Sequence, residues 1–181
     1  MSTTGSTRSE TAVALRVVPV DDLRAIAASE APASERFIDG ALPPPFVAER
    51  ALRQLAEGKP AFWCSTFYIV RESDGYIVGG CGFKDEPYGD RVEIGYAVAP
   101  ACMRQGIGGA AVGALLELAF DSGEASEVLA QVEPSNVAST CLVRKLGFTR
   151  LGIATDEDGT TVFRWLARRG GVAAAAAARA G

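Results

Sequence analysis

Residues 91–120 read RVEIGYAVAPACMRQGIGGAAVGALLELAF and join a predicted strand to a predicted helix through a glycine-rich turn. The strand, Arg91–Ala99, ends at Pro100. From Gly106 to Phe120 the chain is almost wholly apolar, and a helix that is apolar on all sides is a buried one. Glycine inside a helix costs about 0.5–1 kcal/mol relative to alanine. Three glycines at the start of this helix therefore indicate that another group approaches its backbone.

The segments on either side of this unit predict a mixed sheet. Upstream, Thr66–Arg71 and Tyr76–Phe83 flank the turn Glu72–Gly75 and form an antiparallel meander with Arg91–Ala99. Downstream, Glu127–Glu133 is the next strand, and a strand–helix–strand order implies a parallel crossover.

The remaining elements are predicted from capping and turn signals. Asp21 or Asp22 is expected to cap the first helix, and Gly58 to end the second. The fold class is α+β (mixed α/β), with a mixed, mostly antiparallel central sheet flanked by helices. The other expected elements are a strand over 15–18, helices over 22–28 and 47–57, a helix from Ser135 or Asn136 to Leu146, and a closing hairpin of 148–153 and 161–166.

Length and charge narrow the class of protein. The 181 residues suit a single domain over 14–168, with a disordered tail at 1–13 and a low-complexity, alanine-rich tail at 169–181. The net charge of −4 argues against non-specific binding of nucleic acid. No run of 18 apolar residues and no signal peptide are present, so we expect a cytoplasmic protein that does not span a membrane.

The sequence contains no histidine. Ser-His-Asp and Cys-His catalysis and histidine metal sites are therefore excluded, and we expect no metal. Proton transfer must use carboxylates, tyrosine, cysteine, lysine or water. The four cysteines have no C-x-x-C spacing and are expected to be reduced thiols that pack as small apolar side chains: Cys64, Cys81, Cys102 and Cys141.

The glycines of the turn suit an anion. A helix N-terminus presents unpaired N–H groups and a partial positive charge, and it binds phosphate when side chains do not screen the backbone. Gly106, Gly108 and Gly109 remove those side chains, and Arg104 and Gln105 add a cation and an amide. We interpret the turn as a pyrophosphate cradle, with tight packing of the helix on the sheet as the alternative.

A dinucleotide site is a second phosphate-binding hypothesis. Gly106-x-Gly108-x-x-Ala111 satisfies G-x-G-x-x-G/A, and Glu133 ends the next strand as a ribose-binding acid would. The context is poor, because a dinucleotide turn follows its strand at once. Here seven residues separate Val98 from Gly106.

Two motifs together resemble a family. EIGYAVAPACMRQGIGGAA (93–111) and VEPSNVASTCLVRKLGF (132–148) are similar to the GNAT superfamily of acetyl-CoA-dependent N-acetyltransferases. The likeness is closest to the branch that contains the ribosomal-protein N-terminal acetyltransferases. It is strongest over residues 91–153 and extends over 15–166. The family pattern [Q/R]-x-x-G-x-[G/A] places Met103 at its first position, and Arg104 stands where glycine is common.

The resemblance implies a site for acetyl-CoA. In the family, the strand before the cradle separates from its neighbour and binds the pantetheine arm along its free edge. The Val98 amide would then face the thioester carbonyl and stabilise its oxyanion, and Asn136 and Ser139 match an N-x-x-S motif beside the thiol. Asn136 is equally explained as a simple helix N-cap. The cradle residues are Met103, Arg104, Gln105, Gly106, Ile107, Gly108 and Gly109.

The resemblance also implies the chemistry. Glu93 matches the acidic position that accepts a proton from the amine, directly or through water, although a solvated carboxylate on a strand face is the alternative. The tyrosine that many relatives use as general acid is Val143 here. That role stays open among Tyr96, Tyr88 and Cys141, and departure of the thiolate without a dedicated acid is the further alternative.

The expected activity is direct transfer of acetyl from acetyl-CoA to a primary amine, on a protein N-terminus or a small molecule. A non-catalytic acyl-CoA sensor of the same fold and a dinucleotide-dependent oxidoreductase are the alternatives. Asp85, Glu86 and Asp90 form an acidic turn that would attract a cationic amine, or is merely solvated. The oligomeric state stays open, with a homodimer among the options.

Overall fold

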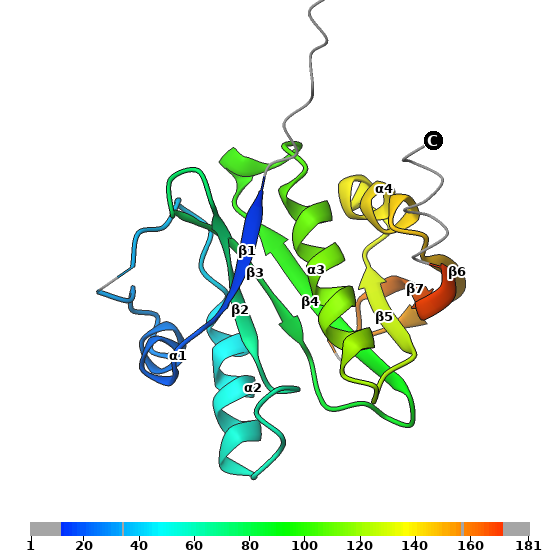
Figure 1. Ribbon diagram of the computed structural model, residues 1–181, viewed down its shortest axis with the longest axis horizontal. Helices are drawn as coiled ribbons and strands as arrows, with labels where there is room; N and C mark the ends of the chain where they lie inside the picture. Colours follow the sequence, from blue (N-terminus) through cyan, green and yellow to red (C-terminus); the bar gives the residue numbers. More distant parts are fainter. Residues whose placement is uncertain (1–11, 34, 157, 172–181) are drawn as a thin grey trace, which may run out of the picture.

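A computed structural model describes residues 12–33, 35–156 and 158–171. These residues contain one seven-stranded sheet in the order β1-β2-β3-β4-β5-β7-β6 (Figure 1). The tails expected at 1–13 and 169–181 lie almost entirely outside the described ranges. The strands are β1 (Val13–Val17), β2 (Thr66–Arg71), β3 (Ile77–Phe83), β4 (Arg91–Val98), β5 (Glu127–Val132), β6 (Thr149–Thr155) and β7 (Thr161–Arg168).

The pairing confirms the predicted mixed, mostly antiparallel sheet. β1 to β4 pair in sequence order as antiparallel neighbours, and β7 pairs antiparallel with both β5 and β6. β4 and β5 pair in parallel, as a crossover through a helix requires. The hairpin turn before β3 uses Gly75 at φ +72°, a conformation that favours glycine.

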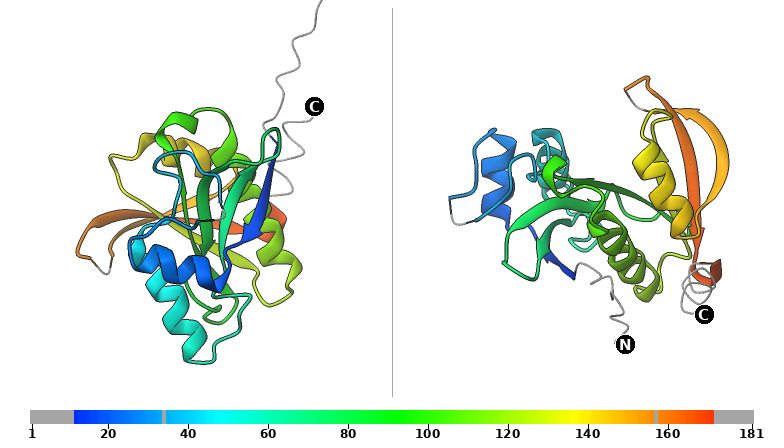
Figure 2. Two further views of the ribbon diagram at one scale, coloured as in Figure 1. Left: turned by 90° about the vertical axis from the view of Figure 1, so that its left-hand side faces the viewer. Right: turned by 90° about the horizontal axis from the view of Figure 1, so that it is seen from above.

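Helices cover both faces of the sheet (Figure 2). α1 and α2 lie on one face, and α3 lies on the other with α4 beside it. None of these helices combines the length and the apolarity needed to cross a bilayer, in the part of the chain that is described. The helices are α1 (Val20–Ala27), α2 (Pro45–Ala56), the 3₁₀ turn η1 (Pro100–Cys102), α3 (Ile107–Asp121) and α4 (Val137–Lys145).

α3 is buried on one side rather than on all sides. Its large side chains, such as Leu115 and Leu116, are fully buried against the sheet, whereas Ala110 and Glu117 are exposed. Glycine and alanine form most of the remaining surface, so an apolar composition does not require a second covering layer here. The prediction that this helix packs on a sheet is confirmed.

Two local predictions were wrong. α1 begins at Val20, and its N-cap is Pro19, so Asp21 and Asp22 lie in the first turn. The Pro19 carbonyl accepts from the Leu23 N–H at 2.9 Å, but its side chain has no hydrogen-bonding atom, so no side-chain cap is made. Cys141 is exposed on α4, whereas the other three cysteines are buried as expected.

Candidate functional site

β4 and β5 separate before either strand ends. Their parallel register runs from Arg91↔Glu127 to Ile94↔Ala130. β4 nevertheless continues to Val98 and β5 to Val132, so the upper part of each strand has no partner on that side. Figure 1 shows the two strands diverging toward the end at which α3 begins. The family resemblance implied this separation, which we call the split.

The backbone of β4 presents donors to the split. The Lys84 N–H donates to the Glu93 carbonyl, and the Ala99 N–H donates to the Val78 carbonyl, both at 2.8 Å. Hydrogen-bonding direction alternates along an antiparallel strand. Odd-numbered residues of β4 therefore bond toward β3, and the N–H groups of Tyr96 and Val98 point into the split. Val98 thus lies on the free edge.

The N-terminus of α3 begins with no side-chain cap. Gly106 is the N-cap residue at φ +82°, no side chain accepts from the first turn, and the first turn carries no acid. The earliest hydrogen bond within the helix runs from the Ala110 N–H to the Gly106 carbonyl at 3.0 Å. The N–H groups of Ile107, Gly108 and Gly109 therefore have no acceptor within the helix.

The three glycines have three different surroundings. Gly106 needs its left-handed conformation. A Cβ on Gly108 would lie 2.9 Å from Leu142 Cδ1 of α4 and 3.6 Å from Val98 Cγ2, so close packing explains this glycine. A Cβ on Gly109 would meet nothing within 4 Å. The packing alternative thus holds for Gly108, while the backbone at Gly109 faces open space.

The loop that precedes α3 exposes three of the predicted residues. Met103, Arg104 and Gln105 are all exposed, Met103 at 53%. Arg104 has φ +61°, in the left-handed region that disfavours side chains with a Cβ. Glycine would adopt this backbone angle without that steric cost.

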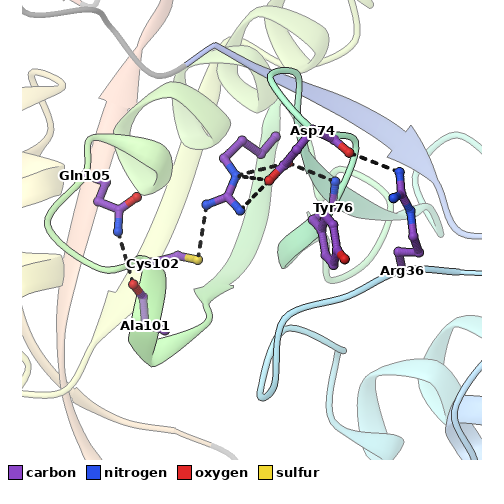
Figure 3. A network of polar contacts seen from close by, with 7 residues as sticks. Arg36, Asp74, Tyr76, Ala101, Cys102 and Gln105 are labelled. Carbon is purple, nitrogen blue, oxygen red and sulfur yellow. Dashed lines mark hydrogen bonds and ion pairs between the residues drawn. The ribbon is translucent and has the colours of Figure 1, made fainter.

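A polar network ties this loop to the turn between β2 and β3 (Figure 3). Arg71, at the end of β2, donates to Asp74 at 2.7 Å and to the Cys102 sulfur at 3.9 Å. Hydrogen bonds, that from Arg71 first, hold the pKa of Asp74 below its ordinary value. Gln105 donates to the Ala101 carbonyl at 3.1 Å and so closes the loop on itself. Sequence reasoning missed Arg71, because 31 residues separate it from Cys102.

α4 starts on the far side of the split. The Asn136 side chain is its N-cap and accepts from the Ser139 N–H at 3.0 Å, which confirms the capping interpretation of Asn136. That bond uses the carbonyl oxygen and leaves the amide NH₂ group available. The Tyr96 side chain extends from β4 to Ser139, so β4 and α4 approach each other at this point.

Glu93 lies on the opposite face of the sheet, where α2 packs. Its Oε1 forms an ion pair with the Lys84 ammonium and accepts from Gln131 Nε2 at 3.0 Å. The side chain is 24% exposed. Lys84 and Gln131 were not predicted, although Lys84 directly follows β3 and pairs with Glu93 in the meander.

Other predicted groups are not brought to the split. Tyr88 is 94% exposed in the turn at the far end of β4. Asp85 is paired with Lys59 at 2.6 Å, and Glu86 lies 3.8 Å from the same ammonium. Partial burial, the largest single influence, raises the pKa of Asp85, but hydrogen bonds led by that from Lys59 hold it below its ordinary value. Within the described residues, no group of acids and cysteines is placed to hold a metal.

Comparison with known proteins identifies the family. The family model described as Acetyltransferase (GNAT) domain matches residues 13–149. The chain therefore belongs to the GNAT acetyltransferases, and acyl transfer from acetyl-CoA is the activity class of this family. This chain is also 36% identical over 92 residues to an uncharacterized N-acetyltransferase, p20, of Bacillus licheniformis. The match covers 50% of this chain and 51% of that protein.

Solved structures share the fold at low identity. The ribosomal-protein-S5-alanine acetyltransferase of Vibrio fischeri has a TM-score of 0.63 and 19% identity, over 86% of this chain and 92% of that one. A mutant form of the spermidine/spermine N-acetyltransferase SpeG of Vibrio cholerae gives 0.65 and 15%, over 90% and 98%. Mycobacterium smegmatis RimJ in complex with CoA-disulfide gives 0.61 and 19%, over 96% of each chain. The scores do not separate protein from polyamine acetyltransferases.

Proposed function

We propose that this protein transfers the acetyl group of acetyl-CoA directly to a primary amine, on a protein N-terminus or on a small molecule. One observation carries the proposal: the split between β4 and β5 opens beside the uncapped N-terminus of α3. The split suits an extended chain that contains amides, and the uncapped helix N-terminus suits a pyrophosphate. Coenzyme A contains an amide-bearing pantetheine arm joined to a pyrophosphate.

Backbone groups would do most of the binding. The N–H groups of Ile107, Gly108 and Gly109 would hold the pyrophosphate, with the open space at Gly109 as the approach. Met103, Arg104 and Gln105 would line the entrance. The free edge of β4 would hydrogen-bond the pantetheine amides as an added strand does, and Asn136 and Ser139 would contact the thiol end.

The acceptor must attack as a neutral amine. At pH 7 a lysine amine is neutral in only about 0.04% of molecules, whereas an α-amine is neutral in roughly 10–15%. Glu93 would accept the proton released on attack, and the Val98 N–H would donate to the thioester oxygen. Val98 lies five positions after Glu93, about 16 Å along an extended strand. The proton would therefore reach Glu93 through water rather than by direct contact.

We propose a primary amine as the acceptor and do not assign it to one class of substrate. Asp85 and Glu86 are both paired with Lys59, and Asp90 accepts a hydrogen bond from the Ser126 hydroxyl, so the acidic turn offers less attraction to a polycation than its sequence suggested. A cytoplasmic location is part of the proposal, because the four cysteines are free thiols.

A non-catalytic acyl-CoA sensor is the second candidate. Two observations favour it: Val143 is fully buried where many relatives have a tyrosine, and the Glu93 carboxylate is already paired with Lys84 and Gln131. A sensor of this kind would bind acetyl-CoA and release no thiol.

Thiol release from acetyl-CoA with a panel of amines separates the two candidates. We expect turnover with at least one α-amine, and a Glu93→Gln variant at least tenfold slower with an unchanged Kd for acetyl-CoA by calorimetry. Glu117→Gln, on the exposed side of α3, is the matched control and should behave as wild type. Equal rates in Glu93→Gln and wild type would remove Glu93 from the mechanism. Binding without turnover for every amine would favour the sensor.

A further inference from the structure

The Tyr96 hydroxyl is buried without a hydrogen bond. Tyr96 lies on β4 beyond the last β4–β5 pair, Ile94↔Ala130, and its side chain lies on the α3 and α4 face of the sheet. Its oxygen is inaccessible to solvent and makes no hydrogen bond of normal geometry among the described residues. Buried hydroxyls are nearly always hydrogen-bonded in folded proteins, so this one is available for a ligand.

One polar side chain of α4, Ser139, lies beside the Tyr96 hydroxyl. Ser139 is close enough to oppose the rise that burial causes in the pKa of Tyr96. Ser139 Oγ is thus a neighbour that can orient the phenol. The next residue, Thr140, also has a buried hydroxyl without a partner. The Tyr96 and Ser139 hydroxyls therefore lie together at this end of the split, where β4 and α4 meet.

We propose that the Tyr96 hydroxyl, oriented by Ser139, donates a hydrogen bond to the thioester sulfur and stabilises the thiolate as it leaves. The inference rests on the proposed function, since it requires the pantetheine arm to lie in the split. It assigns the leaving-group role to a residue of β4 and not to α4.

The electron and proton movements balance with groups already described. The amine nitrogen forms a bond to the carbonyl carbon, the C–S bond breaks, and its electron pair goes to sulfur. The proton lost by the amine goes through water to Glu93. Burial raises the pKa of Tyr96 above its ordinary value near 10, and a free thiol has a pKa near 8.5. The phenol therefore keeps its proton and acts as a donor, and the thiolate is protonated by solvent after release.

The other groups considered for this role are less suitable. Val143, at the position of the relatives' tyrosine, is fully buried and apolar. Tyr88 is in the turn at the opposite end of β4, and Cys141 is on the exposed side of α4. Among these, Tyr96 is the residue whose polar atom is buried beside the split and makes no hydrogen bond of normal geometry.

The test compares wild type, Tyr96→Phe and the matched control Tyr88→Phe, which removes a hydroxyl from the exposed turn. Calorimetry gives Kd values for coenzyme A and acetyl-CoA between pH 6.5 and 9.5. Acetyl-CoA has no ionisable thiol, so the ratio of the two Kd values isolates the thiol. A hydrogen bond to a charged group predicts a bound thiol whose pKa is about one to two units below that of the free thiol.

We expect coenzyme A to gain roughly tenfold or more in affinity over acetyl-CoA as the pH rises, in wild type and Tyr88→Phe. In Tyr96→Phe the ratio should stay flat, and kcat should fall about tenfold or more while the Kd for acetyl-CoA changes little. A ratio that is flat in wild type, or that still rises in Tyr96→Phe, would overturn the inference. A flat ratio in wild type overturns the inference even if the variant does not fold. Failure of wild type to bind either ligand would instead reject the proposed function, and the inference with it.

Discussion

Replacing Gly109 with alanine should make the protein more stable and weaken the binding of pyrophosphate at the N-terminus of α3. Gly109 lies in the first turn of α3, has helical backbone, and has nothing within 4 Å of the place where a Cβ would be built. Alanine is favoured over glycine in a helix by about 0.5–1 kcal/mol. For a chain of this size, that gain corresponds to a rise in Tm of about 1–4 °C.

The same methyl group should weaken coenzyme A binding. Side chains on a helix point toward its N-terminus, so the new Cβ would stand between the first-turn N–H groups and the pyrophosphate. A hydrogen bond to a charged group contributes about 1.5–3 kcal/mol, and loss of one would raise the Kd about tenfold or more. Thermal unfolding without ligand and calorimetry with coenzyme A measure the two effects separately.

Gly113→Ala is the control for this experiment. Gly113 lies one turn further along α3 and also has nothing within 4 Å of a built Cβ. It should give a similar gain in Tm and leave the Kd for coenzyme A unchanged. If Gly109→Ala is stabilised but binds coenzyme A as tightly as Gly113→Ala does, the backbone at Gly109 does not contact the phosphates and our reasoning fails.

Two further predictions concern backbone strain and acid stability. Arg104→Gly should raise the free energy of unfolding by up to about 1 kcal/mol. The substitution relieves about 1–2 kcal/mol of left-handed strain, but part of this gain is lost because glycine makes the unfolded chain more flexible. Arg104→Ala keeps the strain, so equal urea midpoints for the two variants would contradict the prediction. Hydrogen bonds, that from Arg91 first, hold the pKa of Glu127 below its ordinary 4.5, so their contribution to stability is present above about pH 4.5 and is lost as the pH falls through the lowered pKa. Glu127→Gln should therefore lose less stability than wild type between pH 6 and pH 3 in urea unfolding, and an identical loss would show that these pairs do not matter.

The sequence predicted the elements that depend on local signals. The meander around Glu72–Gly75, the apolar helix after Gly106 and the Asn136 cap each depend on turn, period or capping chemistry within a few residues, and each is observed. The cap of α1 was predicted wrongly. Two aspartates are strong capping signals, but the helix begins before them and its N-cap residue, Pro19, makes no side-chain cap.

The contacts of the candidate site depend on sheet register and could not be read in the same way. Glu93 was identified by its position in a motif, but its partners are Lys84, which follows β3, and Gln131 of β5, which is 38 residues away. Tyr96 and Ser139 become neighbours only because β4 and α4 meet across the split. The alternation of side chains along one strand predicts which residues share a face of the sheet. It does not predict which residue of the neighbouring strand lies opposite.

Because no side chain caps α3, the same first-turn N–H groups affect both the stability of the helix end and the binding of the ligand. Without ligand, the first-turn N–H groups face water, so this end of the helix is where local opening should cost least. A bound pyrophosphate would complete the helix as a side-chain cap does elsewhere. The protein's resistance to heat and proteolysis would then follow the concentration of its own substrate.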